Sequence, residues 1–132
     1  SIYGSAKVDA LSTTPGLNMV TSTSASNTAL VAGDHDAITI TKQSDTTISF
    51  SSFSTTAYND FTLNATGRGN ISKTGISKFA VRTDYDLADS PTPAWIANTQ
   101  SSFTIVSADT TGTSQDPKLV VTHLFVPQAM FI

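Results

Sequence analysis

The sequence predicts an all-β protein, an antiparallel β-sandwich of the jelly-roll type with about eight to ten short strands and almost no helix. Short stretches of alternating apolar and polar residues recur along the chain, and Gly, Pro, Asn, Asp and Ser separate them. No stretch carries apolar residues at positions i, i+3, i+4 and i+7 over three turns, the pattern of an amphipathic helix. Parallel α/β folds are excluded because their crossover helices are missing.

The composition fits a single domain over residues 1–132, long enough to bury about 65–70% of its unfolded surface. Cysteine is absent, which excludes a disulfide framework and any Cys-based zinc or redox site. Only 13% of the residues are charged and the net charge is −3, so we expect no nucleic-acid partner. The longest apolar stretch, residues 124–132, is far shorter than the ~20 residues of a membrane-spanning helix, so we expect no membrane span.

The N-terminal half predicts strands at residues 7–11, 17–21, 28–31, 37–42 and 46–53. The Ser/Thr-rich stretches between the first three suit a flexible linker as well, but Leu, Val and Met interrupt them at strand-like intervals. The last two strands alternate most clearly, and only three polar residues connect them. We therefore expect these two strands to pair as a hairpin.

The next part of the chain predicts a strand at residues 56–64 and a loop or short helical turn at residues 65–74, where two glycines occur. Residues 76–82 restore strand alternation, which places Lys78 and Arg82 on the outward face. Strand content therefore continues past the middle of the chain.

The strongest strand pattern lies in residues 101–123, which read as two strands joined by a polar loop at residues 108–117. The side chains expected to face the core lie at every second position: Phe103, Ile105, Leu119 and Val121. We expect these two strands to pair and to close the domain at His123.

An apolar tail, LFVPQAMFI at residues 124–132, follows the last predicted strand. An apolar tail left in water would form an exposed patch, so we expect it to pack on its own domain or on a neighbour. It can add a strand to its own sheet or enter the sheet of another copy, and we favour the second because the predicted strands end before it. The residues expected to fill pockets of the partner are Leu124, Val126, Met130 and Phe131. Residues 1–16 form an N-terminal arm that is a second candidate for contacts between subunits.

The chain begins at Ser1 without Met, and its first residues lack a basic end followed by an apolar run. We expect either a processed product or a start-site artefact.

The longest predicted loop, residues 83–99, carries the only tryptophan and is the candidate binding loop. Aromatic faces suit the apolar side of a sugar ring, and polar side chains beside them can bond hydroxyl groups. The candidate glycan-binding residues are Trp95, Tyr85, Asp86 and Asn98, with Tyr58 as a further aromatic. The alternative is that Trp95 plugs one end of the sandwich.

The same loop holds the candidate Ca²⁺ ligands Asp84, Asp86 and Asp89, since Ca²⁺ prefers carboxylate and carbonyl oxygens. The alternative is that these carboxylates cap turns. We expect no cofactor, and a structural Ca²⁺ ion is the one candidate. Catalysis has little support, because neither G-x-S-x-G nor H-E-x-x-H occurs and only His35 and His123 could act as a neutral base. We expect no enzyme.

Several motifs carry a resemblance to a family. They are residues 58–64, Gly67, residues 71–75, residues 79–82 with Asp86 and Pro91, residues 112–114 and residues 116–122. From about residue 37 to residue 123, the chain resembles the extracellular β-sandwich domains called DNRLRE domains, which are close to a carbohydrate-binding module family found beside polysaccharide lyases. It is also similar to the repeated β-sandwich domains in structural proteins of uncultured tailed phages. His123 stands where an aromatic residue commonly closes the last strand, and residues 124–132 lie outside the module, which suggests a partner.

The leading hypothesis is therefore a non-enzymatic structural or surface protein. The resemblance implies a jelly-roll subunit of a virion, of the decoration, capsid-associated or tail-fibre type, or of an extracellular assembly. Its partners would be its own copies or other surface subunits, at the virion surface or outside the cell. The alternative is a carbohydrate-binding module or adhesin domain that recognises a polysaccharide through the aromatic loop.

Overall fold

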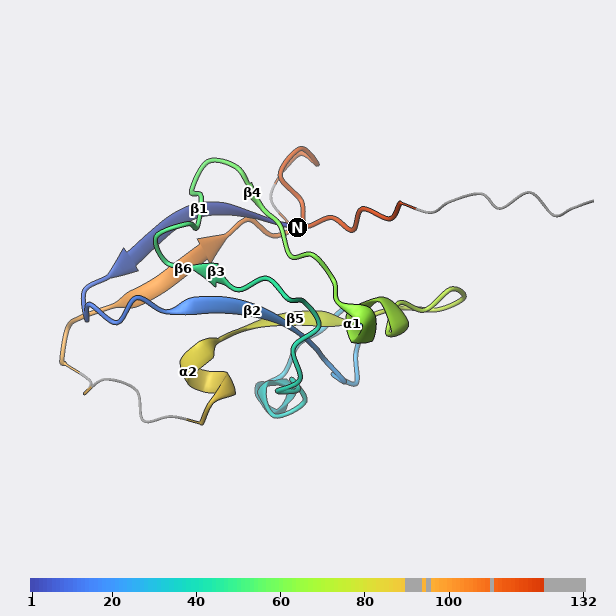
Figure 1. Ribbon diagram of the computed structural model, residues 1–132, viewed down its shortest axis with the longest axis horizontal. Coiled ribbons are helices and arrows are strands. Elements are labelled where there is room, and N and C mark those ends of the chain that lie inside the picture. The colour runs from blue at the N-terminus through green and yellow to red at the C-terminus, as the bar shows by residue number, and fades with distance from the viewer. Residues whose placement is uncertain (90–93, 95, 110, 123–132) are drawn as a thin grey trace, which may run out of the picture.

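The computed structural model describes residues 1–89, 94, 96–109 and 111–122. Within these residues the protein is mostly β structure, with two short α-helices and one short 3-10 helix (Figure 1). The elements, in chain order, are β1 (Ile2–Asp9), β2 (Gly16–Thr21), η1 (Ala32–His35), β3 (Ile48–Ser49), β4 (Tyr58–Asn59), α1 (Ala65–Gly69), β5 (Phe79–Thr83), α2 (Asp84–Leu87) and β6 (Ser101–Ile105). The predicted all-β class with few helices is confirmed.

The strands form two three-stranded antiparallel sheets, one in the order β4-β1-β6 and the other in the order β3-β2-β5. In the first sheet Lys7 of β1 lies opposite Phe103 of β6, and in the second Met19 of β2 lies opposite Val81 of β5. Because β3 and β4 are only two residues long, β1–β6 and β2–β5 are the main pairs. Each sheet has one of its longer strands, β5 or β6, at an edge.

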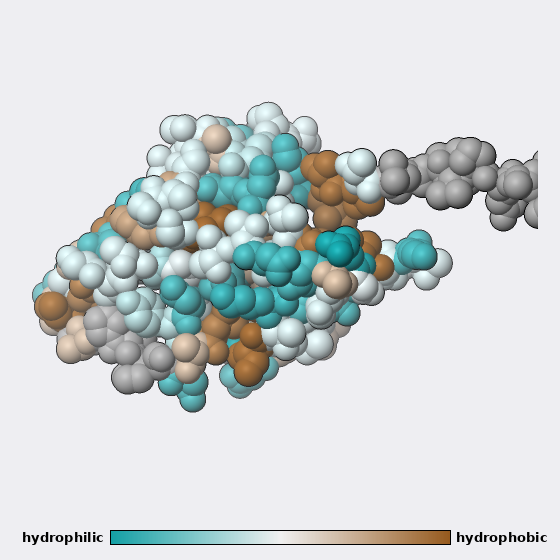
Figure 2. Space-filling model, viewed as in Figure 1, coloured by the Kyte–Doolittle hydropathy of each residue, from teal (hydrophilic) through white to brown (hydrophobic). Residues whose placement is uncertain are grey.

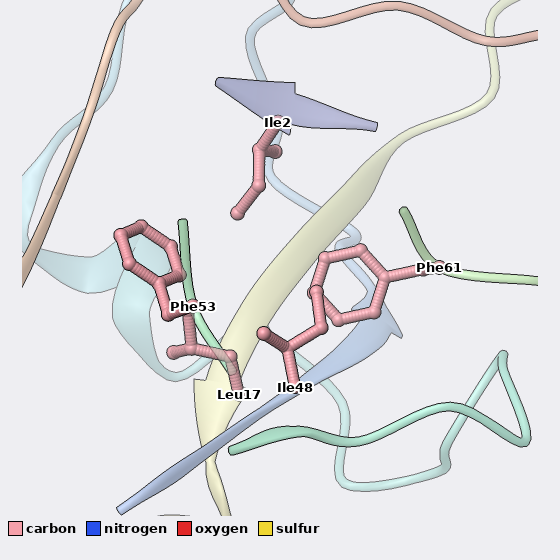
Figure 3. Close-up of a cluster of buried hydrophobic side chains, with 5 residues drawn as sticks. All are labelled: Ile2, Leu17, Ile48, Phe53 and Phe61. Carbon is pink, nitrogen blue, oxygen red and sulfur yellow. The ribbon is translucent and has the colours of Figure 1, made fainter. Parts of the chain in front are cut away.

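The hydrophobic core contains side chains from both sheets (Figure 3). Its buried members are Ile2, Leu17, Ile48, Phe53 and Phe61. Met19, Val81 and Phe103 pack against it and stay partly exposed. Burial of each large apolar side chain stabilises the folded state by about 1.5–3 kcal/mol, so this cluster, with members from both sheets and from loops, stabilises the fold.

The start of the chain is more regular than its pattern predicts. The first strand runs over Ile2–Asp9 instead of residues 7–11, and it is the central strand of its sheet. The strand at residues 17–21 is confirmed as β2. The strand at residues 28–31 is wrong, because the Ser26 hydroxyl accepts the backbone N–H groups of Thr28 and Ala29 and turns the chain away from a ladder.

The hairpin expected from residues 37–42 and 46–53 is wrong, because both segments lie along β2. Ile48 pairs with Leu17 in β2, and the Thr39 N–H donates to the Thr21 carbonyl at 2.9 Å. Between the two segments Gln43 turns inward and is 1% exposed, with its Oε1 accepting from Asn70 Nδ2 at 2.7 Å. Alternation correctly indicated extended chain, but it does not specify the partner strand.

The middle of the chain is shorter in strand than predicted. Residues 56–64 contribute only β4 and one isolated bridge between Ser44 and Leu63. The helical turn predicted within residues 65–74 is confirmed as α1, where Asn64 Oδ1 caps the helix by accepting the Gly67 N–H at 2.9 Å. The strand at residues 76–82 is confirmed in most of its length as β5.

Arg82 lies on the face of β5 opposite Phe79 and Val81, as predicted, but it is not exposed to solvent. Its side chain is only 12% exposed, and its Nε lies 2.7 Å from Asp86 Oδ2. The two residues are four positions apart in the sequence. They meet because α2 begins directly after β5 and brings Asp86 back over the strand. A charged residue could therefore be buried at this position.

The prediction of a closing strand pair at residues 101–123 is only half correct. Residues 101–105 form β6, but β6 pairs with β1 and not with residues 118–122. Leu119 and Val121, expected in the core, are 55% and 60% exposed, and Ile105 is 39% exposed. Of the four predicted core side chains, only Phe103 packs against the core, where its ring lies edge-on to Phe53 at 4.9 Å.

Candidate functional site

The candidate glycan-binding residues are only partly brought together. Tyr85 and Asp86 share α2, but the Tyr85 hydroxyl donates to the Thr13 carbonyl at 2.7 Å and Asp86 pairs with Arg82. Asn98 is exposed at a positive φ of 61°. Because the Tyr85 hydroxyl and one carboxylate oxygen of Asp86 already have partners in the protein, these two residues contribute mainly to local structure. Glycan binding stays a prediction.

Tyr58 belongs to a different part of the protein. It lies in β4, its ring meets Tyr3 edge-on with centroids 5.3 Å apart, and its hydroxyl lies 3.0 Å from the Asp116 carbonyl oxygen. Tyr58 therefore holds the loop before the C-terminal segment and does not extend an aromatic surface on α2.

The three candidate Ca²⁺ ligands serve different partners. Asp84 Oδ1 accepts the Gly16 N–H at 2.9 Å, Asp86 pairs with Arg82, and Asp89 is exposed after the end of α2. Across the described ranges, no group of three or more His, Cys, Asp or Glu side chains is arranged to hold a metal ion. A structural Ca²⁺ ion stays a prediction.

Five predicted site residues lie outside the described residues: Trp95, Leu124, Val126, Met130 and Phe131. The segment that leads into the predicted assembly residues, residues 117–122, is described. The structure therefore bears on the assembly hypothesis through this segment.

The C-terminal segment, which we define as residues 117–122, is fixed at one point to the start of β1. The backbone nitrogen of Ser1 donates to the Lys118 carbonyl at 2.9 Å, and the Lys118 N–H donates to the Ser1 carbonyl at 3.1 Å. The Lys118 ammonium lies 3.6 Å from the centroid of the Tyr58 ring, a cation–π contact. Burial lowers the pKa of the Ser1 amine, and it outweighs the opposing effect of Asp60.

Beyond Lys118 the segment is apolar and exposed. Leu119, Val120 and Val121 are 55%, 71% and 60% exposed, and among the described residues no backbone hydrogen bond joins residues 119–122 to either sheet. Figure 1 shows the segment leaving the body of the protein beside the N-terminus, and Figure 2 shows apolar surface gathered at this point. Three adjacent exposed apolar side chains are unusual on a soluble surface and indicate a contact site.

A hollow of about 420 Å³ opens beside this segment, and we call it the inner hollow. It lies between the two sheets, since it is lined by Ile2 and Ile105 of the first sheet and by Met19, Phe79 and Val81 of the second. Leu119 is one of its lining residues. The apolar interior of the protein is therefore accessible next to the apolar residues of the C-terminal segment.

Comparisons with protein-family models, curated proteins and solved structures found no match for this chain. The resemblance drawn from residues 37–123 stays an inference from the sequence. No helix in the described part of the chain is long and apolar enough to cross a membrane.

Two features of this site were not predicted from the sequence, the unpaired edge of β5 and the inner hollow. Leu119 and Val121 were instead assigned to the core. A usable signal was nevertheless present, because Leu119, Val120 and Val121 are consecutive apolar residues and do not alternate with polar ones. Continuous apolar runs are typical of strands that are buried on both faces.

Proposed function

We propose that this protein is a non-enzymatic structural subunit that assembles with copies of itself through its C-terminal segment. The observation that carries the proposal is the exposure of three adjacent apolar side chains, Leu119, Val120 and Val121, beside an open apolar hollow. Burial of each would contribute about 1.5–3 kcal/mol before the entropic cost of association. Every copy carries both the exposed apolar segment and the hollow, so the segment of one copy can bind in the hollow of another.

The proposal includes the β-sandwich of jelly-roll type that the sequence predicts. Its support is the core, which contains side chains from both antiparallel sheets. With a chain end from another copy, the open side between the sheets would be covered. The sandwich would then be complete only in the assembly.

The setting we propose is a virion surface or another extracellular assembly. The polar exterior supports this, because few residues are charged and two of the lysines are engaged inside the protein. Lys7 Nζ donates to the carbonyls of Phe50 and Phe53 at 2.6 and 2.9 Å, and Lys78 Nζ donates to the carbonyls of Ser24 and Ser26. A surface with so little available charge suits close packing of many identical copies, because like-charge repulsion between them is small.

Light scattering coupled to size-exclusion chromatography tests the proposal. The full chain should elute as an oligomer, and the double variant Val120→Ser, Val121→Ser should shift it to the monomer because it removes apolar contact area. The matched control is Ile40→Ser, Ile96→Ser, which removes two apolar side chains of similar exposure, 66% and 54%, elsewhere on the surface. A wild-type chain that stays monomeric at all concentrations, or a control that dissociates equally, would contradict the proposal.

A further inference from the structure

We infer that the free edge of β5 is the acceptor for the C-terminal segment of a second copy, which adds to this edge as an extra strand. The inference rests on the proposed function and names the surface that the segment binds. The free edge is defined here as the main-chain groups of Phe79–Thr83 that face away from β2.

The register of β5 shows which main-chain groups are free. The Ser22 N–H donates to the Lys78 carbonyl at 3.1 Å, so this pair is hydrogen-bonded. Hydrogen-bonded pairs recur at every second residue of an antiparallel ladder, which assigns Ala80 and Arg82 to bonds with β2. The N–H and C=O groups of Phe79, Val81 and Thr83 therefore point away from β2, and the described residues provide no strand to meet them.

Two hollows adjoin this edge. Phe79 and Val81 line the inner hollow together with Met19. Lys78 lines a second hollow of about 860 Å³, which we call the outer hollow, and Phe79 and Ala80 line both hollows. Residues paired across an antiparallel ladder share a face, and Ser22, the partner of Lys78, also lines the outer hollow.

The outer hollow has a mixed lining, in which apolar residues lie beside polar ones such as Ser22, Ser24 and Asp34. Its lining includes Leu30, Val31 and Ile76, which are exposed large apolar residues. The nearby ammonium group of Lys78 is already bound to the carbonyls of Ser24 and Ser26. A strand placed along β5 would thus lie beside two hollows that both have apolar residues in their lining.

The C-terminal segment has the matching pattern. Side chains alternate between the two faces of a strand, so Leu119 and Val121 would enter one hollow and Val120 the other. A strand with a polar face would leave one hollow open, whereas three consecutive apolar residues fill both. Strand addition of this kind gains affinity from main-chain bonds and specificity from side-chain pockets.

The edge also lacks the usual protection against strand addition. Natural edge strands are guarded by outward Lys or Arg residues, prolines or bulges. In β5 the guanidinium of Arg82 is paired with Asp86 and the ammonium of Lys78 is engaged with the Ser24 loop, so neither guards the edge. The partner is a second copy because Lys118 of the same copy is held at Ser1, beside the start of β1 (Figure 1), so that its Leu119 borders the inner hollow without pairing with β5.

Disulfide trapping tests the inference on a background without native cysteines. One copy carries Ala80→Cys on β5, and a second copy, distinguished by a mass tag, carries Val120→Cys or Val121→Cys so that both strand faces are sampled. Adjacent strands lie about 4.5–5.5 Å apart, within the range that a disulfide spans. After mixing under mild oxidation, we expect a mixed dimer of the two masses for one of the two donor variants. The matched control acceptor is Thr104→Cys on β6, which should give at least tenfold less cross-linked product.

A second variant keeps the test informative if Ala80→Cys fails to fold. Val81→Pro removes an N–H that faces away from β2, so it should block strand addition and leave the β2–β5 ladder intact. A folded monomer is the expected result, whereas a folded Val81→Pro oligomer would overturn the inference.

The outcomes separate this inference from the proposed function. If the wild-type chain is an oligomer but the trapped product forms through Thr104 or within one copy, the β5 acceptor is wrong and self-assembly stands. If the wild-type chain is a monomer, both are wrong.

Discussion

Ser1 and Lys118 exchange both of their backbone hydrogen bonds, at 2.9 and 3.1 Å, although 117 positions separate them in the chain. This bridge ties the C-terminal segment to the start of the central strand β1. Directly after Lys118, the side chains of Leu119, Val120 and Val121 are 55%, 71% and 60% exposed. The exit point of the segment is thus set by the fold itself.

The side chain of Lys118 should strengthen this attachment. In Lys118→Met the cation–π contact with Tyr58 is lost while the backbone bridge can remain, so we expect the free energy of unfolding to fall by about 0.5–1 kcal/mol. Urea denaturation in the presence of a fixed protein concentration measures the change. Lys73→Met, at an exposed loop position, serves as the control and should change stability by less than about 0.5 kcal/mol.

Two glycines in α1 offer a matched pair of substitutions. A Cβ at Gly67 would lie 2.1 Å from the backbone oxygen of Gln43, whereas a Cβ at Gly69 would meet nothing within 4 Å. We expect Gly67→Ala to destabilise the protein by about 1–3 kcal/mol, because two backbone segments would have to separate. Gly69→Ala should be neutral or stabilising by up to about 1 kcal/mol. Thermal denaturation of both variants checks this, and equal effects would show that α1 does not pack against Gln43.

Asp9 should make stability depend on pH. The backbone N–H of Thr13 donates to its carboxylate at 2.9 Å, and with the N–H of Thr14 and the hydroxyl of Ser101 it holds the pKa of Asp9 below the ordinary value despite partial desolvation. The unfolded chain therefore takes up the proton first as the pH falls. The stabilisation is complete above the unfolded pKa of about 3.9 and is lost as the pH falls through the lower folded pKa.

The variant Asp9→Asn tests this dependence. Its melting temperature should lie below that of the wild type at neutral pH, and the difference should shrink once the pH falls below about 3.9. Asp36→Asn, which changes an exposed carboxylate, is the control and should follow the wild type throughout. A difference between Asp9→Asn and the wild type that is independent of pH would exclude the carboxylate's charge as its cause.

Tyr85 distinguishes a structural role from a ligand-binding role. Tyr85→Phe removes the hydroxyl that donates to the Thr13 carbonyl, so we expect a loss of about 0.5–1.5 kcal/mol in the free energy of unfolding. Chemical denaturation gives this value, and a polysaccharide panel gives the effect on binding. An unchanged stability together with lost sugar binding would support the glycan hypothesis instead.

The sequence predicted where extended chain occurs better than how it pairs. Alternation within residues 17–21 and 101–105 is a local property and was sufficient to locate β2 and β6. Their partners depend on contacts between distant segments, so β6 was assigned to residues 118–122 although it pairs with β1. Arg82 was placed in water because its pattern does not reveal that α2 returns Asp86 to it.

The sequence predicted that an apolar segment near the C-terminus forms a contact site, but it did not predict the surface that this segment would bind. The apolar composition of residues 124–132, which lie outside the described residues, predicted assembly through this part of the chain, and the structure shows exposed apolar side chains before it at Leu119, Val120 and Val121. The acceptor edge was beyond prediction, because it exists only where β5 is left at the side of a sheet and two hollows flank it. For the glycan candidates the residue types were as expected, but the Tyr85 hydroxyl and one carboxylate oxygen of Asp86 already have partners within the fold.

Hydrogen–deuterium exchange of the amides at Leu119, Val120 and Val121 tests self-assembly through the C-terminal segment most directly. In the isolated subunit these amides have no backbone partner among the described residues, so they should exchange within seconds at high dilution. We predict that raising the protein concentration slows their exchange, together with the outward-facing amides of Phe79 and Val81, as strand addition supplies acceptors. Fast exchange at residues 119–121 under every concentration, in a protein that is otherwise protected, would contradict the account.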